Sequence, residues 1–549
     1  MNLKEKIIFS LLLLIFFGAL ASWGVIFYYK KTTAIPNYGG EYIEGIVGQP
    51  IHINPVISAS NSADENLARM IFSSLFKYDQ SGNITNDLVE NYEISEDKTQ
   101  YTVHLKKGVL WHDGQTLDAE DVLFTIRLIT DPAYKSPLRA NWQGIEASSP
   151  DAQTLVFKIN NPYVGFLNNL TFGILPKHLW ESVSPENFSL TNLNIEPIGS
   201  GPFKYNPPFQ KDSNGNILSY KLVANPNYFA GKPFISKITF NYYSDDSAII
   251  SAYNKKEIMG ISNISPKKLP EITLTQSTDT HHFNIPRYFA IFFNQTKSLP
   301  LASDEVREAL SYATDRQEII TTILDGNANP VYSPILSGMP GYSEDASKTD
   351  FDLAKANEIL ESNGWSRGDD GIRTKGDARL EINLITTDWP ELADTAEIIK
   401  SQWEKVGLRV NVNKLSISDV QQNHIRPREY DALLFGQVLG ADPDPYSFWH
   451  STQKRDPGLN LSLFGDSDTD KLIENARTEF DQEKRASLYR EFQEKISAER
   501  PAIFLYSPSY IYPLNKKVRG IDIINLVSPS ERFSNIDKWY LKTKRIWNK

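Results

Sequence analysis

ELADTAEIIKSQWEKVGLRVNV, residues 391–412, combines two periodicities in one short segment. Apolar residues recur at helical spacing as far as Trp403, and the expected helix ends at Gly407. Residues 408–412 then alternate between apolar and polar, as the side chains of a half-buried strand do. A helix that leads through a glycine into a strand is typical of α/β architecture. The sequence therefore predicts an α/β protein.

Segments on both sides extend this mixture of strands and helices. Residues 101–105 alternate as a strand, and the next helix is expected to be capped by Thr116 or Asp118. Five further elements are predicted: one helix over 306–324, a helix over 353–360 that stops before Gly364, two helices over 472–480 and 488–496, and a strand over 502–506. No repeat of fixed period occurs, which argues against a solenoid or a propeller.

Length and composition set the class of protein. The 549 residues predict two or three globular lobes, and 40% hydrophobic with 23% charged residues is typical of a folded globular chain. Lys and Arg total 57 against 67 Asp and Glu, so the net charge of -10 provides no basic surface for nucleic acid. The sequence has no cysteine, which excludes disulfides, thiolate metal sites, a cysteine nucleophile and a lipid-modified cysteine.

The N-terminal segment predicts export. Residues 7–29 carry no charge and as a helix would span ~35 Å, enough to cross a bilayer. The first interpretation is therefore a transmembrane anchor over residues 1–31. The alternative is a signal peptide cleaved after Ala21, at the small-residue site Ala19-Leu20-Ala21. Both interpretations place the body outside the cytoplasm. Residues 32–40, with Pro36 and a Gly-Gly pair, predict a short tether.

The sequence contains no complete metal-binding or catalytic motif. Asp466, Asp468 and Asp470 resemble the start of a calcium loop, but the required glycine and glutamate are missing. His281 and His282 are neighbours on an expected strand and point to opposite faces, so they do not chelate one ion together. A nucleophile elbow, a phosphate loop and a His-Glu-x-x-His helix are also missing. We expect no metal, no cofactor and no enzymatic activity.

Seven blocks, spread along most of the chain, occur in a fixed order: LARMIFSSLFKY (67–78), YTVHLKKGVLWHDGQTLDAEDVLFT (101–125), PIGSGPFKY (197–205), NPNYFAGKP (225–233), FFNQ (292–295), VREALSYATDRQEI (306–319) and YDALLFG (430–436). In this order they resemble the extracytoplasmic solute-binding proteins of ABC importers, family 5, which include oligopeptide-, dipeptide- and nickel-binding members. The joint order of the blocks carries the resemblance, since any one of them alone is short.

The resemblance implies a periplasmic-binding-protein fold of the large three-domain type, with two lobes joined by a two-strand hinge. Its expected parts are lobe I (41–80, 200–290 and 508–549), an inserted domain (81–199) and lobe II (291–507). The two hinge strands are expected near Phe292–Asn294 and Phe504–Ser507. A cleft between two lobes that are joined by few crossings is a usual place for a ligand.

The same resemblance implies a function. The chain would be the substrate-binding component of an ABC importer, a monomer that captures short peptides by hinge closure and delivers them to membrane-embedded permease subunits. A nickel chelate, a sugar or a signalling peptide is the alternative ligand. A membrane-anchored peptide or cell-wall hydrolase is a remote alternative of another class, and the sequence offers it no arrangement of nucleophile and base.

The resemblance also implies site residues. Peptide-binding members hold an extended ligand by main-chain hydrogen bonds and fix its amino terminus with an acidic side chain. Asp442 is the candidate acid, although the spacing also allows Ala441 at that position; an Asp-Pro turn is the structural alternative. The other candidate ligand-binding residues are Gly436, Gln437 and Val438 in the same segment, Ser60, Asn61 and Ser62 in a loop of the first lobe, and Tyr446 and Trp449, for which core packing is the alternative.

Overall fold

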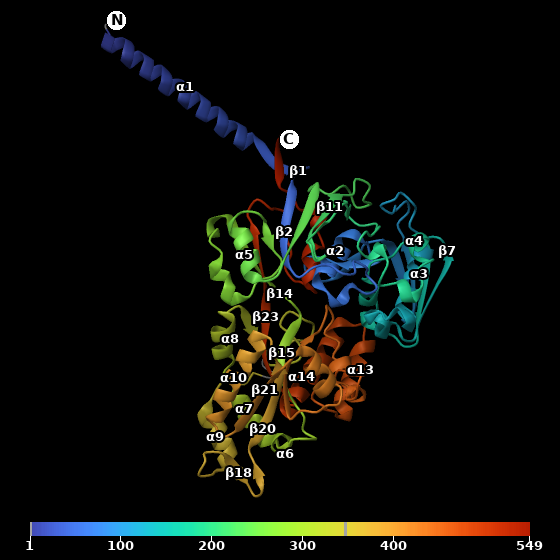
Figure 1. Cartoon of the computed structure of the whole chain (residues 1–549), viewed down its shortest axis with the longest axis vertical. Coiled ribbons are helices and arrows are strands. Elements are labelled where there is room, and N and C mark those ends of the chain that lie inside the picture. The colour runs from blue at the N-terminus through green and yellow to red at the C-terminus, as the bar shows by residue number, and fades with distance from the viewer. Residues whose placement is uncertain (1–2, 345–347, 549) are drawn as a thin grey trace.

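The strands of the main sheet form two groups joined by one long strand, β23 (Ala502–Asn515) (Figure 1). The computed structural model describes residues 3–344 and 348–548. The upper half, residues 38–285 and 508–541, contributes β2 (Glu41–Val47), β9 (Phe203–Tyr205), β10 (Gln210–Lys211), β11 (Ile217–Ala224), β12 (Lys237–Tyr243), β13 (Gly260–Ile261) and β14 (Thr278–Asn284). The lower half, residues 286–507, contributes β15 (Arg287–Phe293), β16 (Ala328–Pro330), β20 (Glu381–Thr387), β21 (Arg409–Leu415) and β22 (Ala432–Val438).

This sheet has mixed strand directions. Its order is β10-β11-β12-β2-β13-β23-β15-β22-β20-β21, with β9 beside β11 and with β14 and β16 beside β23. β2 is parallel to β12 and β13, and β20 is parallel to β21 and β22, whereas the other pairs are antiparallel. Parallel neighbours need crossover connections, and helices supply most of them.

Helices cover the faces of the sheet in both halves. The upper half has α2 (Ser62–Ile71) and α5 (Asp246–Asn254). The lower half has α6 (Leu299–Ala302), α7 (Asp304–Tyr312), α8 (Arg316–Leu324), α9 (Leu353–Ser362), α10 (Pro390–Glu404), α11 (Ile417–Asp419), α12 (Tyr446–Trp449), α13 (Ser467–Thr478) and α14 (Gln482–Glu499). A small sheet, β17 (Ser366–Arg367), β18 (Arg373–Lys375) and β19 (Ala378–Arg379), lies at the far lower end (Figure 1).

A separate four-stranded antiparallel sheet lies at one side of the upper half. Its strands are β5 (Val89–Ile94), β6 (Gln100–Leu105), β7 (Ile145–Asp151) and β8 (Thr154–Ile159), in the order β5-β6-β8-β7. A hairpin of β3 (Phe76–Tyr78) and β4 (Ile84–Asn86) precedes it, α3 (Ala119–Thr130) lies between β6 and β7 in the chain, and α4 (Lys177–Trp180) follows β8. Asp118 caps α3 in a capping box with Asp121, as one of the two predicted caps.

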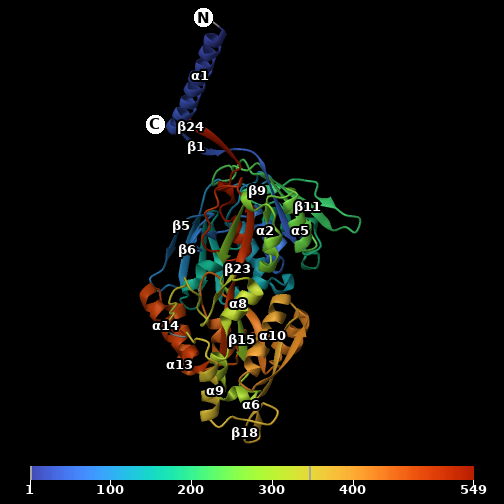
Figure 2. The ribbon, with the colours of Figure 1, turned by 90° about the vertical axis from the view of Figure 1, so that its left-hand side faces the viewer.

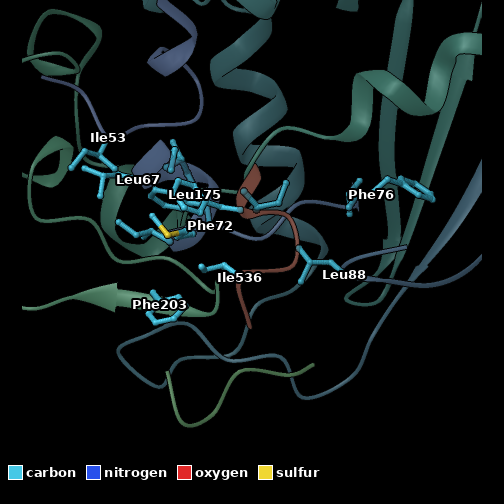
Figure 3. Packing of buried hydrophobic residues seen from close by; sticks show 14 of the residues in the cluster. Ile53, Leu67, Phe72, Phe76, Leu88, Leu175, Phe203 and Ile536 are labelled. Carbon is cyan, nitrogen blue, oxygen red and sulfur yellow. The ribbon is translucent and has the colours of Figure 1, made fainter. Parts of the chain in front are cut away.

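The buried apolar side chains follow the same division. One core draws on residues 42–285 and 510–541, and Figure 3 shows a part in which Leu67, Phe72, Phe203 and Ile536 pack together from distant parts of the sequence. Two further cores lie within residues 288–506. Each half therefore buries its own apolar surface, which is the main source of stability of such a unit.

A buried ion pair ties the two ends of the chain together within the upper core. Arg532 donates from Nη2 to Glu44 Oε1 at 2.6 Å, and both side chains have 0% exposure. Tyr42 and Tyr512 donate their hydroxyls to the same carboxylate, and Arg532 also donates to Asn66 Oδ1 at 2.7 Å. Such a charge is tolerated inside a protein only when its hydrogen bonds are satisfied, and here they are.

The N-terminal helix α1 (Leu3–Lys31) projects from the body beside the last strand (Figures 1 and 2). Among the described residues it is the one helix long and apolar enough to cross a membrane, over Ile7–Lys31. Residues 32–40, predicted to be a short tether, include a paired strand. They begin with β1 (Thr32–Asn37), which pairs antiparallel with β24 (Lys542–Trp547) along its whole length.

Most predicted elements are confirmed, and two are corrected. α10, Gly407 with φ +88° and β21 reproduce the helix–strand unit of residues 391–412. The single helix expected over 306–324 is instead α7 and α8, because Asp315 accepts from the Glu318 amide and begins a new helix. The first crossing between halves lies at Ile285–Pro286, between β14 and β15, whereas the predicted Phe292–Asn294 begins in β15, where Phe292 pairs with Leu433 and Ala502.

Candidate functional site

A cavity of about 370 Å³ lies where the two halves meet. Its floor is formed by the two crossings, at Asn284–Pro286 and Ser507. One wall comes from the upper half, and the opposite wall from the lower half. The wall residues are Ser81, Gly82 and Asn525–Val527 from the upper half, and Asn329–Tyr332, Ile335–Met339, Tyr342, Gly440 and Ala441 from the lower half.

The walls of this cavity are uncharged. No Asp, Glu, Lys, Arg or His is among the described residues that line it. The backbone N–H groups of Gly440 and Ala441 donate no hydrogen bond within the part of the chain that the structure describes. Gly440 has φ +79°, so the chain turns sharply here after β22. An uncharged wall with free backbone donors suits a ligand that offers carbonyl oxygens.

Two further cavities adjoin the first along the same side. The second, of about 290 Å³, shares Val527 with the first and lies between α2 and residues 138–173. The third, of about 1070 Å³, shares Asn141 and Asn169 with the second and separates the four-stranded sheet from α12 and α13. The shared residues make the three hollows neighbours, and the second, which is lined by the upper half alone, lies between the two that both halves line.

Charged side chains gather where the lower half approaches residues 163–168. Asp442 accepts from Arg485 Nη2 at 2.6 Å, and the same guanidinium nitrogen donates to Tyr489 Oη at 2.8 Å. Burial raises the pKa of the Asp444 carboxyl, an effect that Arg477 at 3.0 Å partly offsets. Tyr163 donates its hydroxyl to Asp444 at 3.2 Å and so links the upper half to the lower half.

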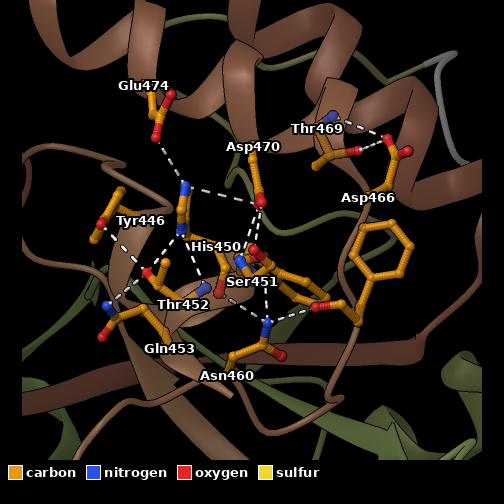
Figure 4. A network of polar contacts seen from close by, with 12 residues as sticks. Tyr446, His450, Ser451, Thr452, Gln453, Asn460, Asp466, Thr469, Asp470 and Glu474 are labelled. Carbon is orange, nitrogen blue, oxygen red and sulfur yellow. Dashed lines mark hydrogen bonds and ion pairs between the residues drawn. The ribbon is translucent and has the colours of Figure 1, made fainter. Parts of the chain in front are cut away.

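A polar network holds the turn after Asp444 in place (Figure 4). Ser451 donates its amide to Asp470 Oδ1 at 2.9 Å, and His450 Nε2 lies 3.2 Å from Glu474 Oε1. Asn460 donates to the carbonyls of Trp449 and His450. The three aspartates that resemble a calcium loop are accounted for in part here, since Asp470 binds Ser451 and Asp466 caps α13.

The candidate residues of the first-lobe loop lie at the start of α2. Asn61 is the N-cap of this helix: its Oδ1 accepts from the Ala63 amide at 2.9 Å, and its Nδ2 donates to Gln49 O at 3.0 Å. Ser60 ends a 3-10 turn over Ser58–Ser60, and Ser62 is the first residue of the helix and is exposed. Their neighbours Ser58 and Ala59 line the second cavity.

Some candidate ligand-binding residues of the lower half lie in the hydrophobic core, and others lie at the gap between the halves. Gly436 and Gln437 lie within β22, where Phe289 packs against Gly436 and Tyr288 donates its hydroxyl to the Gln437 side chain. Val438 ends this strand and is exposed. Trp449 is buried between Phe292 and Phe504, so its packing is that of a core residue.

The remaining candidates lie in the gap or beside it. Tyr446 lines the third cavity, stacks on His450 at 4.3 Å and carries Arg477 over its ring. Ala441 lines the first cavity, and Asp442 next to it is turned toward Arg485.

Sequence reasoning missed several residues of the gap. Arg477 and Arg485 belong to α13 and α14, and no local pattern links them to Asp444 and Asp442. Glu65 lines the second cavity but lies on a helix whose charges suit its own N-terminus equally well. Asn329–Tyr342 lacks regular periodicity, which leaves only its Pro and Gly content as a loop signal.

Comparison with known proteins now identifies the family. The sequence pattern described as "Bacterial extracellular solute-binding proteins, family 5 Middle" matches residues 83–458. The chain belongs to this family. The oligopeptide-binding protein AppA of Bacillus subtilis is one relative of this family 5 protein, 27% identical over 529 residues that cover 93% of each chain.

Solved structures agree with the family 5 fold. AppA of Bacillus subtilis in complex with a nonapeptide superposes with a TM-score of 0.73 at 27% identity, covering 92% of this chain and 100% of AppA. NikZ of Campylobacter jejuni in complex with Ni(L-His) gives a TM-score of 0.75 at 25% identity, covering 91% of this chain and 99% of NikZ. The predicted α/β periplasmic-binding-protein fold is confirmed, and the family places the body outside the cytoplasm.

Proposed function

We propose that this family 5 protein is the substrate-binding component of an ABC importer and captures short peptides between its two halves. The observation that carries the proposal is the uncharged cavity at the crossing, which is lined by Gly440 and Ala441, two residues whose N–H groups donate no hydrogen bond to any described residue. An extended peptide offers one carbonyl and one N–H per residue, so it pairs with such an edge as an added strand would. AppA, a relative over nearly the whole length, was solved with a nonapeptide.

In this proposal the halves act as the two lobes of the receptor. Lobe I comprises 41–80, 200–285 and 508–549, the inserted domain 81–199, and lobe II 286–507, so the boundary expected after residue 290 moves to the crossing that precedes β15. The hinge lies at Ile285–Pro286 and Ser507–Pro508, where the chain crosses between the cores. Because the chain crosses between the lobes only at these two places, closure on a ligand requires changes in few backbone dihedral angles.

Asp442 holds the amino terminus of the peptide in this proposal. Asp442 follows Ala441 of the cavity wall in the chain, and its side chain is 17% exposed. Arg485 satisfies it in the structure, so the ligand ammonium would share the carboxylate with this guanidinium. A carboxylate can accept at about four lone-pair positions, which leaves room for both donors.

The Asp442→Ala variant tests this role. We expect it to weaken binding of a pool of unblocked hexapeptides at least about tenfold, because a charge-assisted hydrogen bond is lost. Binding of the same pool after N-acetylation should differ little between the variant and the wild type. Titration calorimetry measures both affinities. Equal affinity of the two proteins for the unblocked pool would remove Asp442 from the site.

The N-terminal helix serves as the anchor in this proposal. Cleavage after Ala21 would leave Trp23, Ile26 and Phe27 exposed on the mature protein, whereas an intact helix buries them in lipid. Anchoring keeps the receptor near its permease partners, which raises their effective concentration. N-terminal sequencing of the protein from membranes separates a start at Met1 or Asn2 from a start at Ser22, the residue that follows the predicted cleavage site.

Native mass spectrometry of the purified protein tests the function as a whole. We expect a population heavier than the bare chain by the mass of peptides, and release of those peptides unchanged after denaturation. Small-angle scattering should show a smaller radius of gyration with the hexapeptide pool than without it. Identical scattering profiles, together with an unchanged melting temperature, would contradict peptide capture.

A further inference from the structure

Glu65 is a partly buried carboxylate that no other described group neutralises. It lies in the first turns of α2 and lines the second cavity, of about 290 Å³. No hydrogen bond or ion pair to its carboxylate occurs within residues 3–344 and 348–548. Removing a carboxylate from water without a hydrogen-bonding partner costs free energy, so a group that lines a cavity in this state is a candidate to bind something that enters the cavity.

The neighbouring charges leave this cavity with one excess negative charge. Arg69, one helical turn after Glu65, lies 2.9 Å from Glu531 of the 3-10 turn Pro529–Phe533, and the two side chains are only 11% and 13% exposed. That pair is neutral as a unit. Asp64 on the same helix is committed to the Ile51 amide at 2.7 Å. Tyr78, the remaining titratable group of the lining, is neutral because burial raises its pKa to about 12.

The rest of the lining suits a long side chain with an apolar stem. Pro55, Leu138, Trp142 and Phe172 supply apolar surface, and Asn168 contributes an amide. Val527 lines both this cavity and the first cavity, so the two are neighbours, and the proposal requires a side chain of a peptide in the first cavity to reach the second. Lysine and arginine have such a stem below a cationic head, and they bury the stem when the head finds a partner.

We propose that this cavity is a specificity pocket for a lysine or arginine side chain of the bound peptide, with Glu65 as its counter-charge. The proposal rests on the proposed function and deepens it by naming a ligand class. The excess negative charge then serves ligand recognition, because a cation that enters the pocket offsets the desolvation cost of the unpaired Glu65 carboxylate. The pocket also disfavours peptides with Glu or Asp at that position, since two like charges would meet.

The pH dependence follows from the same geometry. Burial, together with Glu531 and Asp64, raises the pKa of Glu65 to about 7. Below that pH the carboxyl is largely protonated and attracts a cation weakly, whereas above it the carboxylate is ionised. Binding of a basic side chain should therefore be strongest above pH 8 and weaken as the pH falls.

The test uses hexapeptide pools that contain either one lysine or one norleucine at a random position. The two side chains share an apolar stem, and only lysine carries the charge. At pH 8 we expect the wild-type protein to bind the lysine pool roughly tenfold more tightly or better. Glu65→Gln should abolish this preference while retaining affinity for the norleucine pool. Glu186→Gln, which removes an exposed carboxylate outside the cavity lining, should keep it.

Further arms identify the source of the cation. Each pool is also measured after N-acetylation, which removes the terminal ammonium and leaves lysine unchanged, and the preference should persist. Lowering the pH from 8 to 5.5 should bring the preference toward one. Binding of both pools without preference, or a preference that survives in Glu65→Gln, overturns the pocket but leaves peptide capture standing. Failure to bind any pool overturns both proposals.

Discussion

At the scale of single residues, the buried charges of this protein differ in how completely they are paired. Glu44 and Arg532 lie fully inside the upper core, with every partner supplied by the protein. Glu65 lies at a cavity without a partner. The first arrangement serves the fold, since it joins β2 to the C-terminal segment, whereas the second leaves a charge available for something outside the chain.

Replacing Arg532 by Met should destabilise the protein strongly. The change leaves Glu44 buried without its counter-charge, and loss of one partner of a buried pair costs about 3–5 kcal/mol. Denaturant unfolding of the exported body measures the free energy. Lys355→Met provides the control, because Lys355 and Glu358 form an exposed helical pair worth at most about 0.5 kcal/mol. Equal effects of the two changes would show that the buried pair contributes no more than a surface one.

Replacing Glu65 by Gln should stabilise the protein, and the gain should depend on pH. The pKa of Glu65 is raised from 4.5 to about 7, so the folded state binds a proton more tightly than the unfolded state. The free energy of unfolding of the wild type therefore falls as the pH rises from about 4.5 to about 7. At pH 8 the variant should be more stable by on the order of 2 kcal/mol, and at pH 4.5 nearly equal. Thermal unfolding at both pH values checks this, and a loss of stability at pH 8 would contradict it.

At the scale of elements, the β1–β24 ribbon fixes how helix α1 leaves the body. Arg545 donates to the carbonyls of Tyr29 and Thr32, at 3.0 and 2.7 Å, and lies 4.3 Å from the centre of the Tyr29 ring. Asn548 donates its amide to Lys31 O at 2.8 Å. The last strand therefore holds the end of α1 in place, and the connection between α1 and the body is stiffer than an unpaired Gly- and Pro-containing segment would be.

Deleting residues 542–549 should free this connection. β1 would lose its only described strand partner, so the Lys31–Thr32 bond becomes accessible to trypsin, which needs an extended and mobile substrate. Limited proteolysis of the detergent-solubilised protein should cut the truncated form near Lys31 much faster than the full chain. The melting temperature of the body should stay nearly unchanged, because β24 contributes nothing to the described cores. Equal cleavage rates would mean that the ribbon does not restrain the linker.

Sequence patterns predicted elements better than they predicted their ends and contacts. The unit at 391–412 was predictable because its helical and strand periods agree with a glycine of positive φ between them. Residues 306–324 keep an apolar stripe through both α7 and α8, and only the cap formed by Asp315 separates the helices. Asp315 is also compatible with the exposed face of one helix, so periodicity alone cannot place the break.

The contacts of the candidate site were even harder to predict from sequence patterns than the ends of the helices. Asp442 could be singled out by its segment, but its partner Arg485 lies 43 residues later on another helix. The ion pair forms because α14 packs against the turn after β22, and this packing is part of the tertiary structure. The raised pKa of Glu65 likewise depends in part on Glu531, which is 466 residues later in the chain, and its proposed role depends on a cavity formed by several elements. Local sequence patterns carry no information about contacts between residues that are far apart in the chain.

At the scale of the whole molecule, polar contacts bridge the gap between the halves on both sides. On one side Tyr163 binds Asp444, and on the other Ser265 Oγ donates to Glu391 Oε1 at 3.2 Å. Lys267 and Asp394 add an ion pair at 3.3 Å, but both are about half exposed and contribute little. These contacts exist only while the halves are close together, so they favour a closed arrangement over an open one.

Tyr163→Phe should shift this balance toward the open form. The ring remains, and only the hydroxyl bound to Asp444 is lost, at a net value of about 1 kcal/mol or about fivefold in the equilibrium. A receptor that must close on its ligand then binds the hexapeptide pool up to about fivefold more weakly, because its competent state is less populated. Calorimetry measures the affinity, and scattering of the ligand-free variant should give a larger radius of gyration than the wild type. Tyr134→Phe is the matched control, since Tyr134 packs on Phe188 and against the core of the upper half. If both substitutions lowered affinity equally, the contact between Tyr163 and Asp444 would have no part in closure, and the energy that holds the lobes together would have to come from the ligand alone.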